Sequence, residues 1–250
     1  MTTFVTRYYS VFLLVIGWEI VARLIDNQVF LPAPSSVALV LARLIASGEL
    51  LEHTGVSTFR ALSGFALAAV VGVPAGIAMG RYRIWENFWN PLISLSYPVP
   101  KIGLIPLFIL WLGIGNLSKI AMIFSAAIYP VVLTTYSGVK GAPTYFVWSA
   151  KSLGASEAEV LKKIIFPYAL PHILTGLRLA MGISWILLFA AEMIAAQSGL
   201  GWLILYAERT LDTPTVFASL VTIAVLGFFF DRVFLGLNHR LCDWYTERTT

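Results

Sequence analysis

The chain has 250 residues, of which 58% are hydrophobic and only 12% are charged, and its formal net charge is +4. Soluble domains carry about 25% charged residues, so the composition excludes a water-soluble globular protein. The basic residues are scattered between apolar runs, which argues against a nucleic-acid-binding protein. We therefore expect a multi-pass protein surrounded by membrane lipid.

Six stretches are long and apolar enough to cross a bilayer, whose hydrocarbon core takes about 20 helical residues. The first carries Glu19 and Arg23, which are spaced to pair on one helix face. A cleaved signal peptide is the alternative for this stretch, but no small-residue cleavage site is present, so we expect an uncleaved helix. The third stretch contains four prolines and is not expected to be one continuous helix. The six predicted spans are Tyr9–Ile25, Ala61–Met79, Phe88–Gly113, Ile120–Val139, Ile173–Ile194 and Val216 to about Leu237.

Between the first two spans, apolar residues recur at helical spacing from Val37 to Ile45 and predict a short interfacial helix. No internal repeat or linker is visible, so we expect a single transmembrane domain over residues 1–250. Lys and Arg are more frequent in the loops on the side of the N-terminus, which places both termini in the cytoplasm by the positive-inside rule. The basic residues on that side are Arg7, Arg81, Arg83, Lys140, Lys151, Lys162, Lys163, Arg232, Arg240 and Arg248.

The loop between the fourth and fifth spans, Lys140–His172, is the longest on the cytoplasmic side and has the pattern of a structured segment. Ser156 followed by Glu159 predicts a capping box, in which each side chain bonds a free backbone N–H at the start of a helix. We expect this helix to run from Glu157 to Ile165, because two prolines, Pro167 and Pro171, follow it. A short rigid helix here suits the transmission of force from a soluble partner, and the alternative is an amphipathic helix on lipid headgroups.

The residues of this loop resemble the EAA loop of ABC-importer permeases. In that family an EAA triplet is followed by a glycine and, ten residues on, by an I-x-L-P element. Ala150, Gly154, Ile164 and Pro167 fit this spacing, and Phe166 stands where the element has leucine.

Three further segments resemble the same family: GLRLAMGISWILLFAAEM, SGLGWLI and, in the third span, YPVPKIGLIPLFILWLGIG. The last resembles the branch that imports nitrate, sulfonates, taurine or bicarbonate, and the similarity runs from about Pro32 to Trp244. One departure is that Trp148 occupies the position of the triplet's glutamate, and Ser149 follows where alanine is usual. An ion pair made by that glutamate in relatives is therefore absent or replaced in this chain.

The resemblance implies an all-α integral membrane fold of six transmembrane helices, the type I ABC-importer permease fold, in the bacterial inner membrane. It also implies two ABC ATPase subunits that hold ATP and Mg, a second permease copy in a homodimer, and a periplasmic substrate-binding protein. The chain lacks a phosphate loop ending in Gly-Lys-Ser/Thr, so we expect no ATP hydrolysis, catalytic residue or cofactor of its own.

Two groups of candidate functional residues follow. Gly154 is expected to permit a close approach or an unusual backbone angle where the loop helix begins. The residues expected to couple to the ATPase are Ala150, Leu153, Gly154, Ala155, Ser156, Glu157, Glu159, Ile164 and Pro167. The candidates for the translocation pathway are Tyr97, Pro98, Pro100, Lys101, Tyr129, Trp185 and Glu192.

Polar groups inside a bilayer are functional candidates by default. Lys101 offers an anion a positive site, and the alternative is that it reaches the membrane interface or contacts phospholipid. The aromatic candidates are gate residues or packing residues. For Glu192 and Arg178, structural hydrogen bonding is favoured over substrate contact. The histidines show no metal-ligand spacing, so no metal site is expected.

Two other classes of protein remain as alternatives. A stand-alone secondary transporter is also a helical bundle, but it often has inverted repeats, and none is evident here. An intramembrane enzyme needs a nucleophile and base or metal ligands that face one another in the spans, and these are missing. We expect a small, often anionic solute of the sulfonate, taurine, nitrate, bicarbonate or aromatic acid type.

Overall fold

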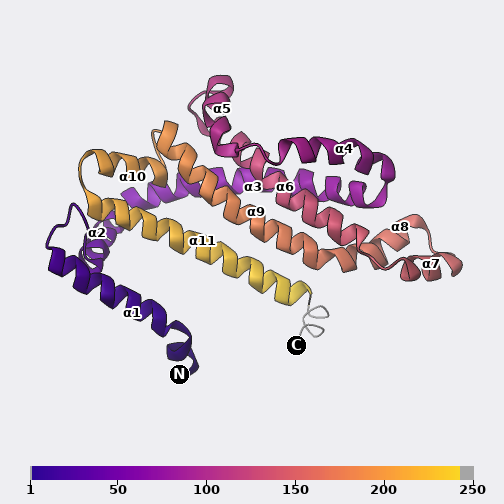
Figure 1. Cartoon of the computed structure of the whole chain (residues 1–250), viewed down its shortest axis with the longest axis horizontal. Helices are drawn as coiled ribbons and strands as arrows, with labels where there is room; N and C mark the ends of the chain where they lie inside the picture. Colours follow the sequence, from indigo (N-terminus) through magenta and orange to yellow (C-terminus); the bar gives the residue numbers. More distant parts are fainter. Residues whose placement is uncertain (1, 243–250) are drawn as a thin grey trace. The chain divides into compact units, whose positions relative to one another are not determined.

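The computed structural model describes residues 2–242, and side chains from residue 9 onward. Two residues discussed above, Trp244 and Arg248, lie outside the described residues, as does the Arg7 side chain. Every regular element in the described part is a helix (Figure 1). The helices are α1 (Thr2–Ile25), α2 (Pro34–Ala46), α3 (Glu49–Arg81), α4 (Arg83–Ser96), η1 (Lys101–Leu104), α5 (Ile105–Leu112), α6 (Asn116–Lys140), α7 (Thr144–Ser152), α8 (Glu157–Val160), η2 (Leu161–Ile165), α9 (Phe166–Ala195), α10 (Leu200–Arg209) and α11 (Thr213–Leu241).

Four helices in the described residues are long and apolar enough to cross a membrane: α3, α6, α11 and the continuous helix Glu157–Ala195. A fifth candidate is the pair formed by α4 and the helical segment Lys101–Leu112, which bends by 87° at the break between them. These five coincide with the second to sixth predicted spans. The first predicted span forms helix α1, which is not among the five, so the sixth crossing stays a prediction.

The described residues pack as two compact units, 2–58 with 192–225 and 59–191 with 226–242. In the first unit, Glu19 accepts hydrogen bonds from Arg23 at 2.7 Å and from the backbone N–H of Ser35 at 3.0 Å, which ties α1 to α2. The predicted pairing of Glu19 with Arg23 is therefore confirmed. Helix α2 also follows the prediction, with Val37 and Leu44 on its buried side.

The core of the second unit contains a close contact between α3 and α6. Gly72, Gly76 and Gly80 recur every four residues on α3. A Cβ atom added at Gly76 would lie 2.6 Å from Cβ of Thr135 and 2.8 Å from the carbonyl oxygen of Val132. Small residues at this spacing allow two membrane helices to approach closely. The two backbones are thus held together by packing that leaves no room for a side chain on this face of α3.

The third predicted span is interrupted, as its prolines predict. Pro98 and Pro100 lie in the break between α4 and η1. The backbone there makes no helical hydrogen bonds, so the N–H that proline lacks is not needed. Pro106 stands in the first turn of α5, where the backbone N–H has no intrahelical partner in any case. Pro91, by contrast, lies inside α4.

The prediction that Pro167 and Pro171 end the loop helix is wrong. Helix α8 continues through the π-helical turn η2 into α9, so that Glu157–Ala195 is one helix of 39 residues. A proline ring clashes with the carbonyl group four residues earlier. For Pro167 that group belongs to Lys163, which lies within η2, where the wider π-helical turn changes the hydrogen-bond register. The capped segment is therefore the start of the fifth span's own helix rather than a separate short helix.

Candidate functional site

The turn between α7 and α8 is built around Gly154, whose φ is +85°. The N–H of Gly154 bonds the carbonyl of Lys151 at 3.0 Å, and the N–H of Ala155 bonds the carbonyl of Ala150 at 3.0 Å. This pair of bonds is the Schellman motif that ends helices at a left-handed residue. A Cβ atom at Gly154 would meet nothing within 4 Å, so glycine is required here for its backbone angle and not for space.

Helix α8 begins with the predicted capping box. The Ser156 hydroxyl accepts from the N–H of Glu159 at 3.3 Å, and the Glu159 carboxylate accepts from the N–H of Ser156 at 3.1 Å. These residues precede the predicted crossing, which starts at Ile173. Hydrogen bonds from Lys163 and then from Ser156 lower the pKa of Glu159 to about 2, so this carboxylate stays charged at physiological pH.

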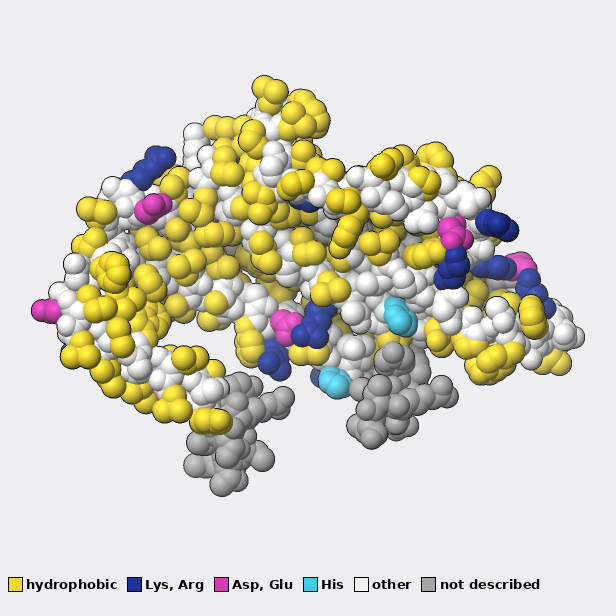
Figure 2. Space-filling view, in the orientation of Figure 1, with side chains coloured by type: hydrophobic (Ala, Val, Ile, Leu, Met, Phe, Trp, Pro, Cys, Tyr) yellow, Lys and Arg dark blue, Asp and Glu magenta, His cyan; other side chains and the backbone are white. Residues whose placement is uncertain are grey.

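Glu157 joins three elements of the second unit. Its carboxylate pairs with Arg81 at the end of α3 and with Lys151 on α7. A second carboxylate joins α4 to α6 in the same way. Glu86 accepts from the Tyr136 hydroxyl at 2.6 Å and pairs with Lys140. Figure 2 shows charged side chains side by side at the end of this unit that carries α7 and α8 in Figure 1. The Arg81–Glu157 pair thus ties the loop to α3, and the Glu86–Lys140 pair ties α4 to α6.

The sequence reading missed these tethers. Arg81 appeared only as one of the basic residues of a cytoplasmic loop, and its partner Glu157 is 76 positions away. The one available signal was that both residues fall at predicted helix ends on the same side of the membrane. That signal predicts that the two residues lie at a similar depth in the membrane, but it does not predict that they pair with each other.

The loop has a buried side and an exposed apolar side. Val160 and Ile165 are buried in a cluster with α6 and α9, and Ala150 and Ala155 pack against it. On the other side, Leu153 is 89% exposed and Trp148 is 69% exposed. Ile164 and Pro167 are half-buried. These large apolar side chains are thus exposed beside the charged residues of the loop.

A cavity of about 660 Å³ lies between the end of α4, η1, α6 and α9 in the second unit. Three predicted pathway residues line it: Tyr97, Lys101 and Tyr129. The Lys101 ammonium lies 4.4 Å from the centroid of the Tyr129 ring and donates to the carbonyl of Ser96. The Tyr97 and Tyr129 rings meet edge to face with their centroids 5.8 Å apart. The break that contains Pro98 and Pro100 carries the first two of these residues to the cavity.

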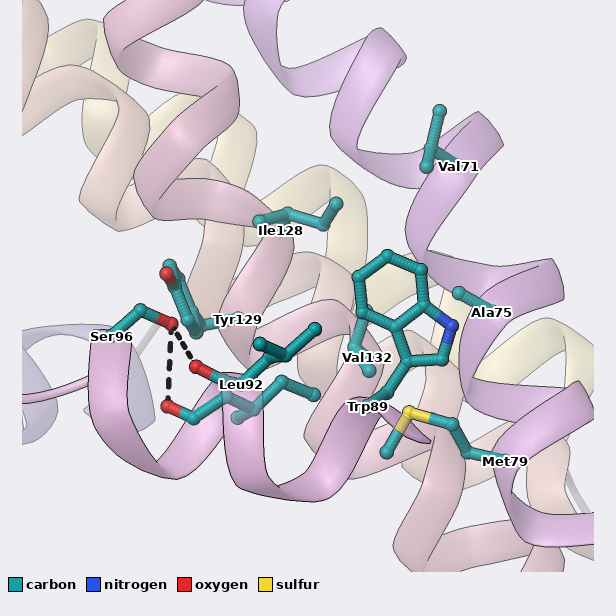
Figure 3. Close-up of a pocket in the computed structure, with 10 residues that line it drawn as sticks. Val71, Ala75, Met79, Trp89, Leu92, Ser96, Ile128, Tyr129 and Val132 are labelled. Atoms are coloured by element: carbon teal, nitrogen blue, oxygen red, sulfur yellow. Dashed lines mark hydrogen bonds between the residues drawn. The ribbon is translucent and has the colours of Figure 1, made fainter. Parts of the chain in front are cut away.

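A second, apolar cavity of about 170 Å³ borders Tyr129. Figure 3 shows Trp89 and Leu92 of α4 facing Val71 and Ala75 of α3 and Ile128 of α6 across it. Ser96 also lines this cavity, but its hydroxyl is bonded to carbonyl groups of its own helix. Tyr129 is therefore shared by an apolar cavity and by the cavity that contains Lys101.

Two other predicted pathway residues, Trp185 and Glu192, lie outside this cavity. Trp185 belongs to the buried core of the second unit, where its ring packs on Phe230 with centroids 5.8 Å apart. Glu192 belongs to the first unit and is 1% exposed. Its carboxylate accepts from the Ser57 hydroxyl at 2.8 and 2.9 Å and from the N–H of Gly201 at 3.0 Å. Neither residue lines the Lys101 cavity.

The surroundings of Glu192 are built from three helices of the first unit. The Ser57 hydroxyl also accepts from the N–H of Leu200 at 2.9 Å, and His53 accepts from the N–H of Gly199 at 3.1 Å. These bonds hold the start of α10 against α3. Arg178, the other charged residue of the fifth span, pairs with Asp231 at 2.5 Å in the second unit. The hydrogen bonding favoured for both residues is therefore present in the structure.

Comparisons with known proteins agree with this architecture. Residues 72–242 match the family model of the binding-protein-dependent transport system inner membrane component. The chain is similar to the taurine transport system permease protein TauC of Escherichia coli, at 37% identity over 94% of this chain and 87% of the relative. It is also similar to a Bacillus subtilis protein named for aliphatic sulfonates transport, SsuC, at 35% identity over 91% and 83% of the two chains.

Among solved structures, the chain resembles a subunit of the MetNI methionine ABC transporter in an inward-facing conformation. The TM-score is 0.59 at 18% identity, over 80% of this chain and 97% of the other. At this identity the likeness concerns the fold alone. The fold is accordingly that of an all-α permease of the ABC-transporter class.

Proposed function

Because the chain belongs to the family of binding-protein-dependent transport system inner membrane components, we propose that it is an importer permease driven by separate ATPase subunits. The chain is a multi-pass inner-membrane protein and a non-catalytic subunit, since its relatives are permeases of ABC transporters. In the proposed assembly two copies of the permease form a homodimer. Two ATPase subunits bind ATP and Mg, and a periplasmic binding protein delivers the solute.

The observation that carries this proposal is the construction of the segment Thr144–Val160. Its Trp148 and Leu153 side chains are exposed, its Val160 is buried, and Glu157 ties it to α3. Because α8 is continuous with α9, a partner that moves the capped start of α8 also moves a membrane helix. We propose that the ATPase docks here, with Trp148 and Leu153 as apolar contacts, and that ATP-driven closure changes the side from which the solute has access.

The proposed route of the solute passes through the cavity beside Lys101. This placement rests on the position of the cavity between three candidate membrane helices and on its single charged lining residue. The names of the relatives favour a small solute that carries a sulfonate group. Trp185 and Glu192 stay predicted pathway residues, but their surroundings favour structural roles.

Both termini are proposed to be cytoplasmic, which places the α7–α8 segment on the side where ATP is available. Residues 1–250 then act as one permease domain with its coupling loop at about residues 140–172. A stand-alone secondary transporter is the rival, and it is separated from the proposal by co-purification. A permease retained in mild detergent should bring its ATPase with it, whereas a secondary transporter should be isolated alone.

The test is the substitution Gly154→Leu. A leucine with φ of +85° is strained by about 1–2 kcal/mol, so we expect the Schellman turn to rearrange and the ATPase to dissociate. Uptake driven by ATP in proteoliposomes should be abolished, while the amount of permease in the membrane stays near that of the wild type.

The matched control is Gly48→Leu. Gly48 also has a positive φ, of +81°, and also has nothing within 4 Å of an added Cβ atom, but it belongs to the turn between α2 and α3 and not to the loop. This variant should transport normally. Normal uptake and normal ATPase retention by Gly154→Leu would contradict the proposed docking.

A further inference from the structure

Lys101 is placed where it can fix the geometry of the broken span. It is the first residue after the break, and its ammonium donates to the carbonyl of Ser96, the last residue of α4. The C-terminal carbonyl groups of a helix have no partner within the helix and carry a partial negative charge, so a lysine there caps the helix. One side chain thus links the two segments that meet at 87°.

The hydrogen-bonding capacity of Lys101 is not exhausted by this cap. An ammonium group has three N–H donors. The carbonyl of Ser96 takes one, and the face of Tyr129 lies 4.4 Å away from the nitrogen. The side chain is only partly buried and lines the large cavity. At least one donor is therefore available to a molecule in that cavity.

The charge of the residues that line the cavity favours an anion over a cation. Among the described residues that line it, Lys101 is the only charged side chain, and no carboxylate is present to receive a cation. Most of the remaining lining is aliphatic, such as Leu133, Ile183 and Leu187. A solute with one negative charge and an apolar body matches this lining. A solute that also carries an ammonium group would have to bury that group without an acidic partner, which is costly.

We propose that Lys101 binds the single negative charge of the transported solute, and that this binding competes with its cap on α4. The occupancy of the cavity is thereby linked to the bend between α4 and α5. This inference rests on the proposed transport function, because it assumes that the solute passes through this cavity. The ligand class is a small organic monoanion such as an alkanesulfonate.

The link to the bend follows from the weak packing of α4. No residue of α4 in the described part of the chain is buried. At its start, Glu86 is bonded to Tyr136 and Lys140 of α6, and an apolar cavity lies beside its middle at Trp89 and Leu92. The cap from Lys101 is a charged contact at the other end. When an anion draws the ammonium away, α4 can change its angle to α5 without breaking a packed core.

The experiment measures this bend in the permease–ATPase complex in lipid nanodiscs. Spin labels are attached at Leu95→Cys on α4 and Leu110→Cys on α5, which are 77% and 79% exposed, in a Cys242→Ala background. Electron–electron distance distributions are recorded with three probes of similar size: ethanesulfonate, 2-aminoethanesulfonate and dimethyl sulfone. They are respectively anionic, zwitterionic and neutral.

We expect ethanesulfonate to shift the distance distribution, 2-aminoethanesulfonate to need at least about tenfold higher concentration, and dimethyl sulfone to have no effect. In Lys101→Met the distribution should already be shifted without solute, and ethanesulfonate should not change it. Lys101→Arg should keep the response, since it retains the charge. Leu117→Met, at an exposed residue of α6 that does not line the cavity, serves as the control and should behave as the wild type.

The outcomes separate this inference from the proposed function. If the wild-type complex with its binding protein shows ATP-driven uptake but all three probes act alike, or ethanesulfonate acts equally on Lys101→Met, the role of Lys101 is refuted while the function stands. The probe series on the wild type decides this even if Lys101→Met fails to fold. If no ATP-driven uptake is found with any solute or any ATPase, the proposed function itself fails.

Discussion

Lys101 and Glu192 are both ionisable residues in predicted membrane spans, but the structure surrounds them differently. Glu192 is fully buried, and its carboxylate accepts from Ser57 and from a backbone N–H of α10. The Lys101 ammonium donates to one carbonyl group and contacts the face of one aromatic ring, and the side chain borders an open cavity. The comparison teaches that an ionisable group within a span indicates a pathway only when donors or acceptors remain that the fold does not use.

This contrast predicts that Glu192→Ala causes the largest loss of stability. The substitution leaves the Ser57 hydroxyl and the N–H of Gly201 buried without their acceptor, which costs about 3 kcal/mol. We expect a lower midpoint of thermal unfolding in detergent, measured by size-exclusion chromatography after heating. Glu49→Ala, an exposed acidic residue at the start of α3, is the control and should change little. An unchanged midpoint for Glu192→Ala would mean that the residue is not structural.

A smaller loss is expected for Ser57→Ala. The variant removes one donor to Glu192 and the acceptor of the Leu200 N–H, so we expect a cost of about 1–2 kcal/mol. Ser184→Ala is the matched control, because Ser184 is equally buried but its hydroxyl only bonds the Ala180 carbonyl of its own helix at 2.7 Å. The same heating assay should show a clear difference between the two serine variants. Equal midpoints would contradict the importance of the hydrogen-bond network around Glu192.

The smallest effect on stability is expected for Lys101→Met. The cost of partly burying the Lys101 charge offsets much of the gain from its carbonyl bond, and methionine fits the aliphatic lining, so we expect a net loss of at most about 1 kcal/mol. Uptake of an anionic solute should nevertheless fall at least about tenfold in proteoliposomes. Lys101→Met would then lower uptake with little loss of stability, whereas Glu192→Ala would lower stability. A large drop in the unfolding midpoint of Lys101→Met would place this residue in the same structural class as Glu192.

Local patterns in the sequence were sufficient for much of the fold. The five long apolar stretches from Ala61 onward, the interrupted third span and the capping box at Ser156 depend on hydropathy, on proline and on residues three positions apart. The positive φ of Gly154 follows from the same kind of local requirement. Such features are encoded within one turn or one helix, so they can be read without knowing the partner.

The remaining features depend on partners that are distant in sequence. The Lys101–Tyr129 contact spans 28 positions, and the pairing of Arg81 with Glu157 spans 76. The continuation of the helix past Pro167 depends on the π-helical turn, which propensity alone does not predict. These contacts are set by how the helices pack, and several arrangements of the same helices satisfy the same local pattern.

The seam of glycines on α3 has a consequence for where movement can occur. With backbone and β-branched side chains of α6 pressed against Gly72, Gly76 and Gly80, sliding of one helix along the other would drive Val131, Thr135 and Val139 into the main chain. Helices α3 and α6 therefore form the fixed wall, and Tyr129 stands on it. Helix α9, which also lines the space beside Lys101, is held to α6 in the same way, because a Cβ atom at Gly176 would lie 3.0 Å from the carbonyl oxygen of Pro130. Widening of this space is therefore expected at the break between α4 and η1, where the prolines lie.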